Sequence, residues 1–124
     1  MALTDAELEA LFIAGEADRT ERKRNADDLV RIRQAVCAFA NDLPNHRQPG
    51  VVYVGFEDDG SCSNLPIDDD LLKRLATMRD DGSITPFPTI EVRRATIQGC
   101  EVAVAIAMVR RGRPATATER RSTI

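Results

Sequence analysis

The sequence is poor in aromatic residues and has no tryptophan. Its 124 residues include one tyrosine and four phenylalanines. Proteins that hold single-stranded nucleic acid without sequence preference stack the bases on aromatic side chains. The arginine-rich segments of this chain have no aromatic residues between their basic positions. The sequence therefore gives no indication of base stacking.

Histidine and cysteine are also scarce, with one histidine and three cysteines. His46 lies in a loop that contains prolines, and Cys37, Cys62 and Cys100 have no close partner in the sequence. Zinc sites use closely spaced ligands of these types, so no zinc site is indicated. An odd number of cysteines without regular spacing predicts reduced thiols in a cytoplasmic protein. We expect Cys37 to be a small residue of the core.

Long apolar runs and nucleotide-binding loops are absent. No apolar stretch approaches the roughly 18–20 residues that span a bilayer, and the acidic, amphipathic start does not resemble a signal peptide. No Gly-x-x-x-x-Gly-Lys-Ser/Thr motif occurs, so a Walker loop for ATP is excluded. The formal net charge of −3 excludes a bulk attraction to nucleic acid, and any basic surface has to be local. We expect a cytoplasmic domain with no membrane partner.

A short run of β-branched and aromatic residues, Val51 to Val54, lies at the centre of the chain. Gly50 precedes it, and the acidic turn Glu57–Gly60 follows shortly after it. Such a run between a glycine and a turn is typical of a buried strand. The strand would deliver a cluster of carboxylates where it leaves the core. We expect part of any functional site there.

Three segments have apolar residues at helical spacing. The first follows a capping box at Thr4 and ends at Gly15. The second follows Asn25 as its N-cap, and Arg31 and Arg33 are expected on its face away from the core. The predicted helices are residues 5–14, 26–41 and 67–78.

Alternating apolar and polar residues predict further strands. The Gln98-Gly99 pair is a tight-turn signal between two of them. The predicted strands are a polar, exposed or edge strand near residues 20–22, a short return strand over 61–65, and a hairpin of 89–97 and 100–109. The sequence thus predicts one α/β (α+β) domain over residues 1–109, with a mixed sheet of about four to six strands and about three helices. Residues 110–124 form a basic tail that we expect to be poorly ordered.

Acidic residues form the first candidate site. They are Glu16, Glu21, Glu57, Asp58 and Asp59. Three convergent carboxylates can bind a divalent metal, such as magnesium or manganese, and activate water for phosphodiester cleavage. Acidic residues at turns and strand ends also serve solubility alone. The composition leaves both interpretations open.

Basic residues form the second candidate site. Four of them fall within residues 19–24, two lie on the second predicted helix, and others follow in the tail. They are Arg19, Arg22, Lys23 and Arg24, then Arg31 and Arg33, then Arg110, Arg111, Arg113, Arg120 and Arg121. Two such clusters on one face would contact phosphates. The alternative is a solvated charged face without a ligand.

The order of these motifs resembles the Schlafen-type, AlbA-like DNA-binding domain of many bacterial transcriptional regulators. The matching motifs are Gly15-Glu16, Glu21-Arg22-Lys23, Ala38–Asn41, Gly50–Gly60, Asp69 with Leu71-Leu72, residues 79–84 with Pro86 and Pro88, and Gly99–Ile106. The resemblance covers about residues 5 to 109. It implies an α/β fold and nucleic-acid binding. Such domains are often labelled ATP-binding too, which no motif of this sequence supports.

Relatives with ribonuclease activity imply a catalytic and metal-binding set in this chain. Carried across by motif, the set is Glu16, Glu21 and Asp58, with Glu57 or Asp59 as alternatives to Asp58. Two departures stand out. The family usually has Phe where this chain has Arg22, and the family's last strand is replaced by residues 111–116, which run into a proline. A missing strand would leave a sheet edge open.

Three functional hypotheses follow. The main one is a non-enzymatic nucleic-acid-binding domain, with DNA or RNA as partner. Its expected phosphate contacts are Arg19, Arg22, Lys23, Arg24, Arg31, Arg111 and Arg113. The second is a metal-dependent endoribonuclease. The third is a truncated, non-functional relative or a protein-interaction domain without catalysis, whose open sheet edge could pair two copies as a homodimer. The first two require the polar segment 16–24 to lie beside the end of the central strand.

Overall fold

The described residues form three α-helices around a mixed sheet, which confirms the predicted α+β class. The computed structural model describes residues 3–15, 18–42, 47–82, 84–85, 88–109 and 116–117. The elements in chain order are α1 (Asp5–Ala14), β1 (Thr20–Lys23), α2 (Leu29–Asn41), β2 (Gly50–Val54), α3 (Asp69–Ala76), the 3-10 helix η1 (Thr77–Arg79), β3 (Ile84–Thr85), β4 (Ile90–Ile97), β5 (Cys100–Ala107) and β6 (Thr116–Ala117). In the part described, no helix is long and apolar enough to cross a membrane.

Four strands form the main sheet, in the order β1-β2-β5-β4. β1 runs parallel to β2, and the other neighbours are antiparallel. The predicted hairpin of β4 and β5 is confirmed, with Gln98 and Gly99 at its turn. β1 and β4 are the edges, which also confirms the polar edge strand predicted near residues 20–22. Pairing of two copies through an edge stays a prediction.

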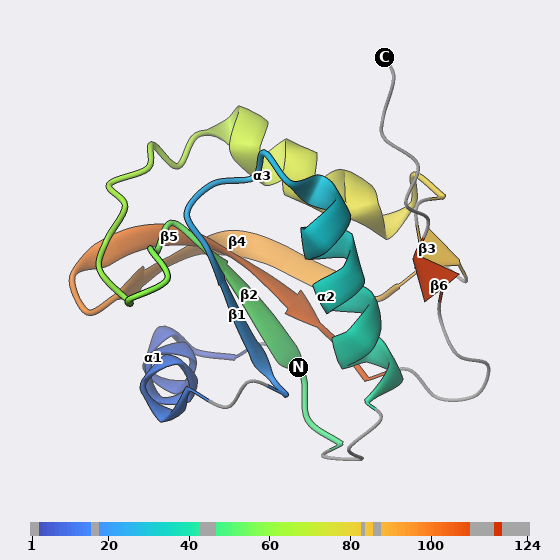
Figure 1. Ribbon diagram of the computed structural model, residues 1–124, viewed down its shortest axis with the longest axis horizontal. Coiled ribbons are helices and arrows are strands. Elements are labelled where there is room, and N and C mark those ends of the chain that lie inside the picture. The colour runs from blue at the N-terminus through green and yellow to red at the C-terminus, as the bar shows by residue number, and fades with distance from the viewer. Residues whose placement is uncertain are drawn as a thin grey trace.

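Helices cover both faces of this sheet (Figure 1). α1 packs on one face against Val51 and Tyr53 of β2. α2 and α3 pack on the other face against Val52 and Val54. Successive side chains of a strand point to opposite faces, so β2 contributes to both cores and is buried along its whole length. The prediction of a buried central strand is confirmed.

α1 is held at its start, at its end and from the sheet. The predicted capping box of Thr4 and Glu7 is present, and Gly15 ends the helix in the left-handed conformation, with φ 64°. The Tyr53 hydroxyl of β2 donates a buried hydrogen bond to Leu8 O at 2.8 Å. This bond ties the backbone of α1 to the central strand.

The second helix differs from its prediction in two ways. It begins at Leu29 with Asp28 as N-cap, whereas the Asn25 side chain accepts from the backbone of Asp27 in the preceding turn. Arg33 is 5% exposed and does not lie on the outer face. It occupies the fourth position after Leu29, which places it on the buried stripe of the helix. Its guanidinium reaches Asp81, with 3.9 Å between Nη2 and Oδ2.

The prediction of three reduced thiols is wrong for two of the cysteines. Cys62 and Cys100 form a disulfide across 38 positions of sequence, with 5.8 Å between their Cα atoms. The chain turns back after β2: the disulfide joins Cys62 to the first residue of β5, and an isolated antiparallel β-bridge pairs Cys62 with Phe56. This bridge takes the place of the return strand predicted over residues 61–65. Cys37 is buried in the core, as predicted.

The C-terminal part differs in smaller ways. The predicted third helix is shorter than expected and continues as η1. β6 lies within the predicted tail, and it pairs with β3 in a separate two-stranded sheet. The other residues of the tail, together with Glu16 and His46, lie outside the described residues. The poor order expected for that tail stays a prediction.

Replacing Gly50 with alanine should destabilise the protein by about 1–3 kcal/mol, because it overpacks the core. The added Cβ would lie 2.2 Å from Cγ of Phe39, a ring of α2 that packs on the start of β2. Urea unfolding of Gly50→Ala, Phe39→Leu and the double variant measures the effect. The smaller side chain should recover part of the loss in the double variant. A Gly50→Ala protein as stable as the parent would contradict this packing.

Replacing Tyr53 with phenylalanine should lower the free energy of unfolding by about 1 kcal/mol at neutral pH, because the buried hydrogen bond from the hydroxyl to Leu8 O is lost. Burial raises the pKa of Tyr53 above its ordinary value of 10, against a weaker opposite effect of Arg19. Above that pH the unfolded chain loses the phenolic proton while the folded chain keeps it, so stability falls as pH rises. Denaturant titrations at several alkaline pH values should show this loss in the parent protein and less of it in Tyr53→Phe.

Candidate nucleic-acid interface

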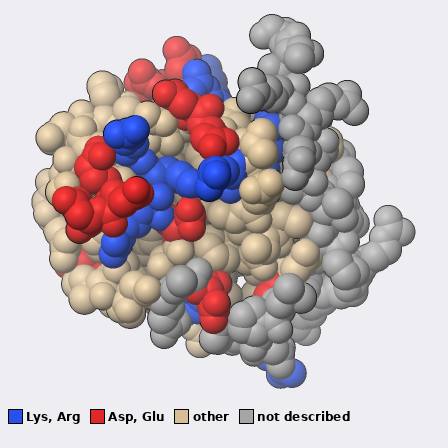
Figure 2. Space-filling model, in the orientation of Figure 1, with Lys and Arg blue, Asp and Glu red and all other residues tan. Residues whose placement is uncertain are grey.

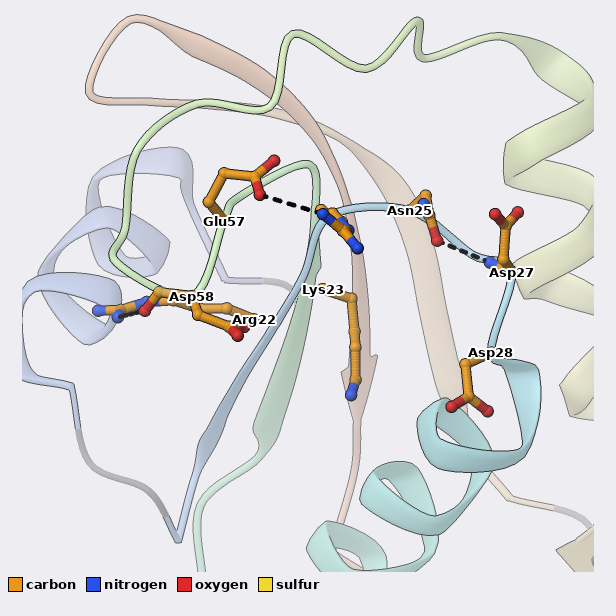
Figure 3. A pocket seen from close by; sticks show the side chains of 8 residues that line it. Arg22, Lys23, Asn25, Asp27, Asp28, Glu57 and Asp58 are labelled. Atoms are coloured by element: carbon orange, nitrogen blue, oxygen red, sulfur yellow. Dashed lines mark hydrogen bonds and ion pairs between the residues drawn. The ribbon is translucent and has the colours of Figure 1, made fainter.

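A pocket of about 430 Å³ lies at the C-terminal end of β1. Its walls are the end of β1, the segment that leads into α2, and the acidic turn after β2 (Figure 3). The lining residues are Arg22, Lys23, Arg24, Asn25, Asp27, Asp28, Glu57 and Asp58. Two segments that the sequence marked separately, one basic and one acidic, therefore meet in one site.

The parallel pairing of β1 with β2 brings these segments together. Its register sets Lys23 opposite Val54, the last residue of β2. Lys23 O then accepts from the backbone N–H of Gly55 at 2.6 Å and of Phe56 at 3.2 Å. The prediction that the polar segment lies beside the end of the central strand is confirmed for its described part.

Arg22 joins three elements at the rim of the pocket. Its Nη1 donates to Asp58 O at 3.4 Å, and its Cζ lies 4.7 Å from the ring centroid of Phe12 on α1. Phe12 stacks in turn on Phe56, with 4.2 Å between the ring centroids. The Schlafen-type family usually has Phe at this position. Arg22 packs on an aromatic ring there through a cation–π contact.

The acidic turn is closed by its own hydrogen bonds. Glu57 N donates to Ser61 O, and Gly60 N donates to Glu57 O. The Ser61 hydroxyl and backbone N–H both donate to the Asp59 carboxylate, and these two bonds lower the pKa of Asp59. Ser63 Oγ donates to Glu57 Oε2 at 2.5 Å. Because Asp59 is engaged within the turn, the carboxylates that line the pocket from this side are Glu57 and Asp58.

The described basic residues divide by what they contact. Arg19 donates from Nε and Nη2 to Pro49 O, and Lys23 pairs with Glu21 at 3.2 Å. The side chains of Arg24 and Arg31 are 72% and 71% exposed, although each has a carboxylate within 4 Å. Figure 2 shows Lys and Arg side chains gathered between two groups of acidic side chains near the end of β1. Arg24 and Arg31 thus present the accessible guanidinium groups of this set, while Arg111 and Arg113 lie outside the described residues.

The predicted carboxylate set is only partly visible. Glu21 lies on β1 and pairs with Lys23, Asp58 lies at the pocket, and Glu16 lies outside the described residues. Among the residues that the structure describes, no group of three or more His, Cys, Asp or Glu side chains could hold a metal ion. A magnesium or manganese site that includes Glu16 stays a prediction.

Three pocket residues were not predicted as part of a site. Asn25, Asp27 and Asp28 line it opposite the acidic turn, and Asp28 also caps α2 through a bond from Arg31 N. In the sequence, Asn25 was interpreted only as a helix cap, and Asp27 and Asp28 were not assigned to a site. The sequence feature that could have indicated them is their position directly after the basic segment, between Arg24 and the helix.

The fold has a counterpart among solved structures. The solution structure of the N-terminal domain of a RecG-related protein from Nitrosomonas europaea is similar, with a TM-score of 0.58 and 20% sequence identity. The match covers 99% of this chain and 92% of that one. At this identity the similarity shows the fold alone. No curated protein matches the chain.

A family model described as Schlafen, AlbA_2 matches residues 16–123. The matched range contains the sheet, the pocket and both segments that form its walls. It also extends beyond residue 109, where the resemblance in motifs ends. The match covers most of the chain, and the chain therefore belongs to the Schlafen, AlbA_2 family.

Proposed function

We propose that this domain binds nucleic acid, with DNA as the main candidate, as in the DNA-binding domains of bacterial transcriptional regulators. The observation that carries the proposal is a pair of exposed guanidinium groups: Arg24 lines the pocket at the end of β1, and Arg31 pairs with Asp28 of the pocket lining. Membership of the Schlafen, AlbA_2 family supports it. The similar solved domain comes from a protein related to a DNA helicase, which agrees with the same class of ligand.

The proposed contacts are with phosphates and not with bases. A guanidinium group presents a planar set of donors that fits phosphate oxygens. Contacts to phosphate hold the protein on the polymer and carry no sequence information directly. Arg19 and Arg22 donate to backbone carbonyls, so their part is to shape the site. Arg24 and Arg31 supply the charge.

Few phosphates would be neutralised, and this sets the expected salt dependence. With about two phosphate contacts, the logarithm of the binding constant for duplex DNA should fall against the logarithm of salt concentration with a slope of about −2. Affinity should then drop about tenfold between about 50 and 200 mM salt. The carboxylates of Asp28 and Glu57 compete for the same guanidinium groups, so the binding is expected to be weak.

Changing Arg24 and Arg31 to glutamine should weaken binding about equally for all sequences and reduce the salt slope by about one for each residue. Fluorescence anisotropy with labelled duplex DNA and labelled RNA, over a series of salt concentrations, measures both effects. Arg79→Gln is the matched control, because Arg79 is exposed on η1 and does not line the pocket. Binding that is absent, or that salt does not change, rejects the proposal.

Metal-dependent RNA cleavage is the alternative proposal. Its specific support is that Glu21 pairs with Lys23, which lines the same pocket as Asp58. Glu16 would complete the set. The reaction would need magnesium or manganese to activate the attacking water.

Glu21→Gln should slow cleavage of structured RNA in manganese or magnesium by at least about tenfold, because changes even beyond the direct ligands cost that much. Glu101→Gln on β5 is the control, since Glu101 is exposed and does not line the pocket. A rate that is the same in both variants and the parent would reject Glu21 as a ligand. RNA binding without cleavage in the parent would favour the main proposal.

A further inference from the structure

A disulfide supports one wall of the pocket, and a thiol reagent can reduce it. The Cys62–Cys100 disulfide joins the segment after the acidic turn to the first residue of β5. That turn is the wall that carries Glu57 and Asp58. The link between the wall and the sheet is therefore a bond with reversible chemistry.

The two ends of the acidic turn are held differently. At the first end, Phe56 is 2% exposed, stacks on Phe12, and donates from its backbone to Lys23 O. At the second end, Ser63 N donates to Gly55 O, and Cys62 is joined to Cys100. Without the disulfide, Ser63 N still donates to Gly55 O, and the buried Ile67 further along the chain is still held by Arg94, but the covalent link from this end to the sheet is gone. The first end stays anchored in the aromatic cluster.

The acidic turn contacts the basic wall of the pocket, which is formed by Arg22, Lys23 and Arg24. Glu57 lies 3.8 Å from Arg24, and Ser63 Oγ holds the other oxygen of the same carboxylate. Asp58 O accepts from Arg22. Because Ser63 follows Cys62 directly, the disulfide fixes the residue that orients Glu57 toward Arg24. Figure 3 shows this carboxylate facing the basic segment across the pocket.

We propose that the disulfide is a thiol-sensitive latch that keeps the acidic turn against the basic wall. Reduction releases the second end of the turn, so Glu57 leaves Arg24 and no longer competes with a polyanion for its exposed guanidinium group. The effect on binding rests on the proposed function, whereas the release of the turn does not. The reduced protein is then the form with higher affinity.

The chemistry is thiol–disulfide exchange with a dithiol. One thiolate of the dithiol attacks Cys62 Sγ, which is half-buried, while Cys100 is 5% exposed and less accessible. The S–S bond breaks, and Cys100 leaves as a thiolate that takes up a proton. The second thiol of the reagent then displaces Cys62, so the dithiol is oxidised to its disulfide and the protein gains two electrons and two protons.

The first experiment tests the latch without any ligand. Alkylation after unfolding should label one of the three cysteines in the untreated protein and all three after dithiothreitol treatment, counted by mass. Hydrogen exchange of both native forms should then show faster exchange at the amides of Glu57 and Gly60 after reduction, and unchanged exchange in α2. Equal exchange at the turn in the two forms would overturn the proposal, as would three labelled cysteines before treatment.

The second experiment compares affinity for labelled duplex DNA at fixed salt. Releasing one surface ion pair should make the reduced protein bind about two- to fivefold more tightly. Cys62→Ser should bind like the reduced protein without a reductant, and Cys37→Ala, outside the disulfide, should keep the response. If Cys62→Ser does not fold, the reduced parent protein is compared with the oxidised one instead.

Equal affinity of both forms would refute the latch as a control of binding. Absence of binding in both forms would refute the proposed function, and faster exchange would still support the latch.

Discussion

The site depends on the pairing of a short polar strand with a buried one. β1 has no apolar side chain of its own, so side-chain burial does not explain its position. Backbone hydrogen bonds explain the position of β1: Val51 N donates to Arg19 O at 2.8 Å, and Gly55 N donates to Lys23 O at 2.6 Å. The Arg19 side chain adds two bonds to Pro49 O at the same end. These contacts hold both ends of β1 in register, and the pocket follows from that register.

β2 supplies the rigid partner that this pairing needs. Its side chains enter two cores on opposite faces, so it cannot shift by one residue without exchanging both sets of contacts. At Gly50, an added Cβ would meet the ring of Phe39, which shows how closely α2 approaches the strand. A strand fixed on both faces gives a constant end point for the acidic turn and, through it, for the pocket (Figure 1).

Local signals in the sequence predicted much of this fold. The capping box of α1, the hairpin turn at Gln98-Gly99 and the run from Val51 to Val54 each depend on neighbouring residues, and each is confirmed. The errors involve partners distant in sequence. Arg33 lies on the buried stripe of α2 with Asp81 as its distant ion-pair partner, and Cys62 meets Cys100 because the chain turns back after β2. The prediction of Asn25 as the N-cap of α2 failed for another reason, since Asn and Asp cap helices about equally well and Asp28 is the cap.

The same limit applies to the site. The sequence predicted that a basic and an acidic segment meet, and their described parts do, because the motif order fixed their place around β2. The role of each arginine was not predictable, since it depends on which carbonyl or ring lies within reach. Of the basic residues between positions 19 and 24, Arg19 and Arg22 contact backbone carbonyls and Lys23 pairs with Glu21. A count of basic residues therefore overstates the phosphate contacts that this surface can make. In a domain with a net charge of −3, the affinity for a polyanion depends on which few guanidinium groups the acidic side chains leave accessible.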